Sequence, residues 1–356
     1  MMIIIASVLA AAAPLEVRVL EKATPIQIQL SAEKIACDGK VLPGKVLDAA
    51  AGAREVKIGG QLCVEVVAEG GDGVGVAFND VKRRYPGQIH VTLEGGLLRL
   101  INVVDVEAYL PSVVDAEANG SKAAALEAQA IVSRTFAITA QKRHERAGYH
   151  LCDLAHCQLY RGNAAAVPDA AAAVKKTAGQ VLLIGGIVLK PAFFHSACGG
   201  HTSRAVDVFG EDGAGSAVSD IEKVGGPRCG GDDFAWSFEV EKVDFAKALN
   251  VAPNGRALEP LRRDEGGRVL EVRVFGKRLS SGEFLSRVGR TFGWQAVRSM
   301  KFSISETDTQ LRLDGTGLGH GVGLCQLGAR SLADKGVDAK GILQRYFPES
   351  QIKPIP

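Results

Sequence analysis

The chain has 356 residues, of which 46% are apolar and 23% charged, and its formal net charge is +2. These proportions are those of a globular protein with a substantial core, and the length suggests roughly two domains. They exclude extended disorder, a collagen-like repeat and a protein with many membrane spans. A net charge near zero and an aromatic content of only 6% also argue against nucleic acid as the main partner.

The first residues form an unbroken apolar run, MMIIIASVLAAAA, from Met1 to Ala13. This run is too short to cross a bilayer as a helix, which needs about 20 residues, so no stable transmembrane anchor is expected. It suits the apolar region of a signal peptide, with small residues for cleavage at Ala11 to Ala13, although no Lys or Arg precedes it. The alternative is a buried first strand. We expect an exported protein of the periplasm, the cell envelope or the extracellular space.

Seven cysteines are spread along the chain, and six of them form pairs that are near in sequence: Cys37 with Cys63, Cys152 with Cys157, and Cys198 with Cys229. In an oxidising compartment this pattern predicts up to three disulfides that close local loops. In a reducing compartment the same residues would be buried thiols. We expect a Cys198–Cys229 disulfide, with Cys325 remaining a thiol.

The predicted fold class is α+β. Residues 14–97 alternate between apolar and polar, as in LEVRVLEK and QIHVTLEG, and turn residues interrupt the runs. This period of two predicts an N-terminal region of short antiparallel strands. The pattern changes at Val106, where a short helix to about Val114 is expected. A turn at Asn119-Gly120 and a long Ala-rich helix, which Ser121 could cap, follow it.

Residues 98–356 are predicted to form a mixed α/β domain built on that long helix. A distinct module is inserted at about 240–310. It begins with a helix in EKVDFAKALN and a strand in RVLEVRVFG, continues through SGEFLSRVGRTFGW, and closes with a strand in KFSISE. Between Arg256 and Lys301, eleven Lys or Arg residues stand against five acidic ones. This basic insertion is either a solvated face or a contact for an anionic polymer.

Glu117 is the first candidate for chemistry. It lies in AEANGS, just before the long helix and between apolar segments. A carboxyl group in an apolar cleft has its charged form disfavoured, so its pKa would rise toward the value that a general acid needs. Asp115, two residues earlier, could be a like-charged neighbour. The alternative is a surface carboxylate near a helix N-terminus.

A polar loop at 148–163 contains His150, Cys152, His156 and Cys157. Two imidazoles and two thiols within eight residues could close a tetrahedral zinc site. The alternatives are a Cys152–Cys157 disulfide beside two incidental histidines, or neither arrangement. We expect a structural role in each case, because nothing in the pattern places an open coordination position next to Glu117.

The segment GTGLGHGVGLCQLGA, residues 315–329, is rich in glycine, but no Lys-Ser or Lys-Thr follows it, so it is not a phosphate-binding P-loop. Its glycines would bring the backbone close to a bulky ligand, with His320 and Gln326 as the polar contacts. The alternative for His320 is a structural histidine with satisfied hydrogen bonds.

Six motifs in register resemble the SpoIID/LytB family: YLPSVVDAE, EAQAIVSRTFA, CDLAHCQLYRG, FFHSACGGHT, SSGEFLSRVG, and GLGHGVGLCQLGARSLADKG followed by ILQRYF. The resemblance runs from about Leu98 to Phe347. This family comprises the stage II sporulation protein D type of peptidoglycan lytic transglycosylase and its amidase-enhancer relatives.

The resemblance implies cleavage of the β-1,4 bond between N-acetylmuramic acid and N-acetylglucosamine in peptidoglycan strands, without water, leaving a 1,6-anhydro end. It implies that Glu117 is catalytic, that Arg134 is the arginine of the VSRTF motif, and that the 148–163 loop resembles the zinc cluster of some members. No cofactor is implied beyond this structural zinc. The alternative is a non-catalytic wall-binding protein that enhances a partner N-acetylmuramoyl-L-alanine amidase.

A single glutamate is chemically sufficient for that reaction. Hydrolytic glycosidases usually need two carboxylates, whereas a lytic transglycosylase can work with one, because the C6 hydroxyl of the substrate attacks the anomeric carbon. Arg134 would lie about five turns from Glu117 in a continuous helix, so it either braces the fold or binds glycan through another face. The chain departs from the family motifs at Ala118-Asn119, where Met-Pro is usual, and at Cys325, where Ser is usual.

Overall fold

The computed structural model describes residues 13–162, 168–210, 229 and 234–355. The apolar run predicted as a signal segment lies outside these residues, except for Ala13. The chain forms two compact units: the first contains residues 1–119 and 137–179, and the second contains residues 120–136 and 180–356. The boundaries between the units differ from the predicted boundary between residues 97 and 98. Two helices that follow the β-region, α1 (Val106–Ala118) and α3 (Pro168–Lys176), belong to the first unit.

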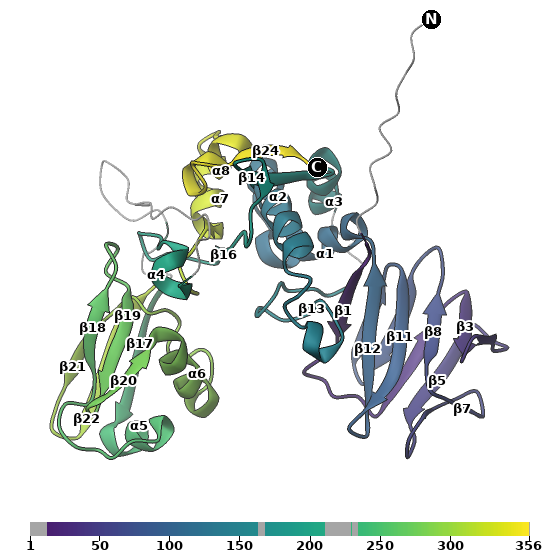
Figure 1. Ribbon diagram of the computed structural model, residues 1–356, viewed down its shortest axis with the longest axis horizontal. Coiled ribbons are helices and arrows are strands. Elements are labelled where there is room, and N and C mark those ends of the chain that lie inside the picture. The colour runs from purple at the N-terminus through teal and green to yellow at the C-terminus, as the bar shows by residue number, and fades with distance from the viewer. Residues whose placement is uncertain (1–12, 163–167, 211–228, 230–233, 356) are drawn as a thin grey trace, which may run out of the picture. The chain divides into compact units, whose positions relative to one another are not determined.

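The N-terminal part of the first unit is a sandwich of two sheets (Figure 1). One sheet has the order β13 (Leu151–Cys152), β1 (Leu15–Val19), β12 (Leu97–Val104), β11 (Gln88–Glu94), β8 (Val66–Glu69), β3 (Lys34–Cys37) and β4 (Lys40–Val41). The other has the order β10 (Val81–Tyr85), β9 (Val74–Phe78), β2 (Gln27–Ser31), β5 (Val46–Ala51), β6 (Val56–Ile58) and β7 (Gln61–Cys63). Apart from the parallel pair of β1 and β13, the strands are antiparallel, which confirms the predicted β-region and the α+β class.

A disulfide between Cys37 and Cys63 joins the two sheets, because β3 carries the first cysteine and β7 the second. Both residues are buried. This bond confirms the first of the three predicted cysteine pairs. Cys152, Cys157, Cys198, Cys229 and Cys325 are thiols.

The helices that follow differ from the prediction at their ends. Helix α1 begins after Asp105, whose carboxylate accepts from the N–H of Glu107, and it continues one turn beyond the expected end near Val114. Asn119 and Gly120 then separate it from α2 (Ala123–Thr139). The predicted cap, Ser121, lies two residues before α2 and accepts a hydrogen bond from Arg330 instead.

The second unit has its own apolar core around the buried face of α2. The helices α7 (Gln326–Asp334) and α8 (Ala339–Tyr346) pack there with the small sheet of β15 (Ile187–Val188), β14 (Gln180–Ile184) and β24 (Gln351–Pro354), as Figure 1 shows. Two short parallel strands, β16 (Phe194–His195) and β23 (Leu324–Cys325), lead into this core, and helix α4 (Ala205–Phe209) follows β16 along the chain.

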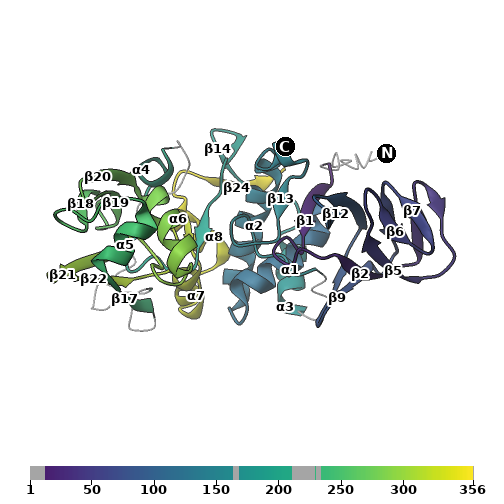
Figure 2. The same ribbon diagram turned by 90° about the horizontal axis from the view of Figure 1, so that it is seen from below.

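The module predicted at about 240–310 forms a separate apolar cluster within the second unit. It contains two three-stranded sheets, one of β17 (Ala235–Glu241), β22 (Gln310–Thr316) and β21 (Phe302–Glu306), the other of β18 (Glu259–Arg263), β19 (Val269–Val274) and β20 (Lys277–Ser280). Helices α5 (Lys242–Leu249) and α6 (Ser281–Phe292) lie side by side in it (Figures 1 and 2). The helix and the two strands expected from the sequence are present as α5, β19 and β21, and the segment between the two strands contains β20 and α6.

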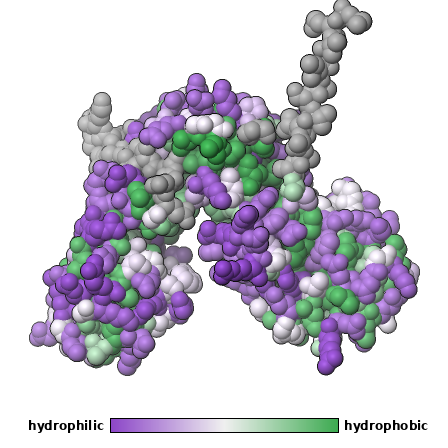
Figure 3. Space-filling view, viewed as in Figure 1, coloured by the Kyte–Doolittle hydropathy of each residue, from purple (hydrophilic) through white to green (hydrophobic). Residues whose placement is uncertain are grey.

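The basic excess of this module is largely on its surface. Figure 3 shows hydrophilic residues over much of the module on the face in view. Arg273 pairs with Glu259 at 2.7 Å and Arg278 with Glu271 at 2.7 Å, so part of the positive charge is neutralised within the sheet. This supports the interpretation as a solvated face. Among the helices of the described residues, none is long and apolar enough to cross a membrane.

Candidate active site and metal centre

Glu117 lies in the last turn of α1 and is half-buried. Its Oε1 accepts a hydrogen bond of 2.9 Å from the backbone N–H of Leu159. The C-terminal end of a helix carries the negative end of the helix dipole and does not stabilise an anion. The carboxylate of Glu117 is therefore held by the 157–161 segment rather than by its own helix.

The 157–161 segment is itself fixed on α1 by buried contacts. The hydroxyl of Tyr109 donates to Oε1 of Gln158 at 3.1 Å, and the N–H of Arg161 donates to Oγ of Ser112 at 3.1 Å. The rings of Tyr109 and Tyr160 are 4.6 Å apart, and both side chains are fully buried. Because this segment is anchored before and after Leu159, the orientation of Glu117 is set by a rigid neighbour.

Asp115 is not the like-charged neighbour that the sequence suggested. It precedes Glu117 by two residues within the same helix, and side chains at that spacing point to different faces. The sequence predicted the end of the helix near Val114, four residues too early, so both carboxylates were expected outside it. The carboxylate of Glu117 is thus separated from the acidic side chain nearest to it in sequence.

A group of four possible metal ligands lies beside this segment: His144, Cys152, His156 and Cys157, here called the loop cluster. Their ligand atoms all lie within 4.8 Å of one another. Nε2 of His144 is 3.3 Å from Sγ of Cys157, and Nδ1 of His156 is 3.8 Å from Sγ of Cys152. Two imidazoles and two thiols are a donor set that suits tetrahedral zinc.

The structure replaces one member of the predicted ligand set. Nδ1 of His150 accepts a 3.1 Å hydrogen bond from the N–H of Glu16, as β13 pairs with β1, so His150 is directed to the sheet. His144 takes its place because a 3₁₀ turn at Glu145–Ala147, closed by Gly148 at φ 71°, reverses the chain. The signal in the sequence was a histidine eight residues before Cys152, which lies outside the 148–163 loop.

Electrostatics link the loop cluster to Glu117. Burial raises the pKa of Tyr109 well above its usual value, and the nearby Tyr160, Cys157 and Glu117 raise it further. The hydrogen bond from Cys152 lowers the pKa of Cys157 to about 7, with the backbone of Cys152 and the charge of Arg143 acting in the same direction. Tyr109 is thus a neutral, buried side chain that is close enough to feel the charge of both the cluster and the carboxylate.

A contact with Arg143 indicates which nitrogen of the His156 ring carries the proton. The guanidinium of Arg143 lies 3.2 Å from Nε2 of His156 and can only donate, so the ring carries its proton on Nδ1. A metal on Nδ1 would displace that proton. Arg143 also donates to the backbone oxygen of His156 at 3.1 Å, a contact that does not depend on the ring.

Arg134 is fully buried in the second unit. Its guanidinium donates to the backbone oxygens of Ala130 at 3.5 Å and Gln180 at 3.1 Å. Of the two roles that the sequence left open for Arg134, these contacts support bracing of the fold, because a side chain without exposed surface cannot touch a glycan.

His320 and Gln326 also belong to the second unit, and both are half-buried. Nδ1 of His320 accepts a 3.0 Å hydrogen bond from the N–H of Val322, and its ring stacks at an angle against Phe193 and Phe209. His320 also lines an apolar cavity of about 100 Å³ beside α6. These contacts are those of a structural histidine with one face toward a small cavity.

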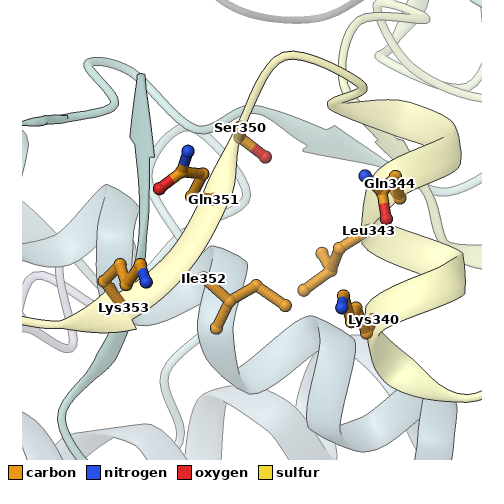
Figure 4. Close-up of a pocket in the computed structure, with 7 residues that line it drawn as sticks. All are labelled: Lys340, Leu343, Gln344, Ser350, Gln351, Ile352 and Lys353. Atoms are coloured by element: carbon orange, nitrogen blue, oxygen red, sulfur yellow. The ribbon is translucent and has the colours of Figure 1, made fainter. Parts of the chain in front are cut away.

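A larger hollow of about 460 Å³ lies between α8 and β24 (Figure 4). Its polar lining includes Lys340, Gln344 and Lys353, and none of the described residues that line it carries a carboxylate or an imidazole. A site without such groups lacks the acid and base that glycan cleavage requires, so it is not the candidate active site.

Fold and site together define an α+β protein with one oriented carboxylate beside a candidate His₂Cys₂ metal centre. Residues 94–183, which contain Glu117 and the whole loop cluster, match the SpoIID family model, described as Stage II sporulation protein. Stage II sporulation protein D of Bacillus subtilis is 24% identical over 271 residues, covering 70% of this chain and 74% of that protein. An uncharacterized protein of Brachyspira hyodysenteriae is 26% identical over 279 residues, covering 77% and 73%. These matches support the assignment of the chain to the SpoIID family.

Proposed function

We propose that the protein is a peptidoglycan lytic transglycosylase that cleaves the β-1,4 bond between N-acetylmuramic acid and N-acetylglucosamine. The observation that carries this proposal is the position of Glu117, a half-buried carboxylate in the family-matched region that a backbone N–H holds at 2.9 Å. The substrate class comes from the family resemblance. Because peptidoglycan lies outside the cytoplasmic membrane, the proposal places the protein in the periplasm or the cell envelope.

In the proposed reaction Glu117 acts twice. As a carboxylic acid it protonates the glycosidic oxygen, and the bond between that oxygen and C1 of N-acetylmuramic acid breaks. The C6 hydroxyl of the same sugar forms the new bond to C1, and its proton passes to the carboxylate of Glu117. The acid is regenerated, no water is consumed, and the product is a 1,6-anhydro end.

The loop cluster would hold one zinc ion through His144, Cys152, His156 and Cys157. Bound zinc would supply a cross-link between the 144–148 turn and the start of the 157–161 segment, not a site for substrate. Since Leu159 of that segment holds Glu117, the residues of the cluster are positioning residues for the carboxylate.

The test is turnover of purified full-length protein on intact and peptide-stripped glycan strands in H₂¹⁸O, with mass analysis of the ends. Anhydro ends without ¹⁸O support the proposal. Reducing ends that carry ¹⁸O would indicate hydrolysis instead. Binding to both substrates without new ends of either kind would favour the alternative, a non-catalytic wall-binding enhancer, which stimulation of a partner amidase would then test.

A further inference from the structure

A second group of histidine and cysteine side chains lies in the core of the second unit: His195, Cys198, Cys229 and Cys325, here called the buried cluster. The parallel pair of β16 and β23 sets His195 opposite Cys325. The ligand atoms of His195, Cys198 and Cys325 lie within 4.8 Å of one another, and Sγ of Cys229 is 2.8 Å from Sγ of Cys198. His195 is 4% exposed and the three cysteines are 0% exposed.

The ring of His195 is oriented as a metal ligand. Its Nδ1 lies 3.0 Å from the backbone oxygen of Val322, which can only accept, so Nδ1 carries the proton and Nε2 presents a lone pair. Nε2 is buried and has no hydrogen-bond partner among the residues that the structure describes. A buried polar atom without a hydrogen-bond partner lowers the stability of the folded protein. Metal-bound histidines commonly donate their other N–H to a backbone carbonyl, as His195 does.

The surroundings of the sulfur atoms favour thiolates. Sγ of Cys325 accepts from the N–H groups of Cys198 at 3.3 Å and Gly328 at 3.4 Å, at the N-terminus of α7. Such donors and the positive end of a helix stabilise a negative sulfur. Arg268 is 2% exposed and donates to the backbone oxygen of Cys198 at 3.1 Å. Three thiolates and one Zn²⁺ together carry a net charge of −1, which the positive charge of Arg268 would offset.

We propose that the buried cluster is a second, structural zinc site, with three thiolates and Nε2 of His195 as its ligands. Tetrahedral zinc has Zn–S bonds of about 2.3 Å and Zn–N bonds of about 2.0 Å, which places ligand atoms about 3.5 to 4 Å apart. That spacing fits within the observed span, and it requires the sulfur of Cys229 to move about 1 Å from that of Cys198. A closed four-ligand set leaves no position for substrate, so this ion would hold three distant segments in the core, independently of the proposed transglycosylase activity.

A Cys198–Cys229 disulfide, which the sequence predicted, is the competing arrangement. It would use two of the three sulfur atoms and leave Nε2 of His195 unsatisfied. One zinc ion uses all four groups and satisfies that nitrogen. The two arrangements also differ in the number of thiols, which makes them separable by experiment.

The experiment uses the full chain with Cys152 and Cys157 both replaced by serine, so that the loop cluster cannot bind zinc. Protein purified without chelator should contain about one zinc per chain, and Co²⁺ in its place should give the intense thiolate-to-cobalt absorption of a tetrahedral site. Adding His195→Gln or Cys325→Ser to this background should remove the metal and weaken that absorption. Thiol titration in guanidinium and EDTA, without reductant, should find three thiols, since Cys37 and Cys63 form the disulfide.

One thiol in place of three, together with no bound metal, would establish the disulfide and overturn the proposal. Three thiols with no zinc uptake would overturn it as well. The thiol titration is made on denatured protein and the metal analysis on the background variant alone, so neither depends on whether His195→Gln or Cys325→Ser folds. Turnover on glycan strands is measured in parallel on the wild-type chain, in which the loop cluster is intact. Its absence there would bear on the proposed function without touching this result.

Discussion

The loop cluster and the buried cluster offer similar ligands in opposite settings. In the loop cluster three ligands come from six consecutive residues, Cys152 to Cys157, and His156 is exposed. In the buried cluster the ligands come from three separate segments, and each is nearly inaccessible to solvent. The first therefore orders a loop, whereas the second joins strands and helices that form a core.

The difference has a functional consequence because only the loop cluster has a described contact path to Glu117. Cys157 is two residues from Leu159, whose N–H holds the carboxylate. The buried cluster belongs to the other unit, together with the core residues of α2, α7 and α8. Perturbing the first cluster should reach the chemistry, and perturbing the second should change stability alone.

The largest expected effect is that of Glu117→Gln. The amide keeps the shape of the side chain and can still accept from Leu159, but it cannot cycle a proton. General acid–base catalysis is worth about 10² to 10⁴-fold, so turnover of glycan strands should fall by that factor while binding persists. Asp115→Asn, on a different face of the same helix, is the matched control and should stay within about threefold of wild type. Equal losses in the two variants would remove Glu117 from the catalytic role.

The next effect tests the ligand set of the loop cluster with two histidines. His144→Gln should lose about one zinc per chain and lower the free energy of unfolding by roughly 4 kcal/mol, a size typical of lost metal sites. His150→Gln should keep the zinc, because glutamine can still accept from the N–H of Glu16. Metal analysis and denaturant unfolding check both. The reverse outcome would restore the ligand set predicted from sequence.

Chelation of the wild-type protein tests the structural role of the ion in the loop cluster. Chelation should lower stability before it lowers the turnover of the molecules that remain folded. If folded, metal-free protein lost all turnover and added zinc restored it, the ion would take part in the chemistry, and the mechanism with one glutamate would need revision.

Arg134→Met addresses the second unit without touching either cluster. Two backbone oxygens would lose a charged donor inside the core, which should cost about 2 to 4 kcal/mol of unfolding free energy. Turnover corrected for the folded fraction should stay unchanged, since the side chain is fully buried. A rise in KM without a loss of stability would instead indicate that Arg134 contacts glycan.

Local patterns predicted much of this fold, and long-range contacts account for what they missed. The strands β1 and β11 and the helix α5 could be predicted from hydrophobic periodicity, because that periodicity follows from which side chains of each element are exposed. Glu117 was placed in a turn because Asn119-Gly120 marks a helix end but does not fix which residue is the last. The loop cluster was partly visible because its ligands are near in sequence. In the buried cluster the sequence joined Cys198 to Cys229 but not to Cys325. Cys325 is 127 residues from Cys198, and the long-range pairing of β16 with β23 that brings it into the cluster leaves no local signature.

The smallest effect separates ordinary electrostatics of the second unit from metal binding. Glu306, at the end of β21, accepts from Nζ of Lys242 at 3.1 Å and lies 3.4 Å from Nε of Arg256. Burial alone would raise the pKa of this carboxyl, but Lys242, the N–H of Ala257 and Arg256 together lower it below its usual value. A lowered pKa in the folded state means that the unfolded chain binds the proton more tightly. The stabilisation is therefore present above the unfolded pKa and is lost as the pH falls through the folded pKa. Glu306→Gln should lower stability by about 1 kcal/mol or less at pH 7, and the difference from wild type should shrink on acidification below about pH 4. Thermal unfolding at both pH values, with and without EDTA, measures this difference in stability. The difference should become smaller with added salt and should not change with EDTA. A contribution from a bound metal should instead be lost with EDTA and depend little on salt.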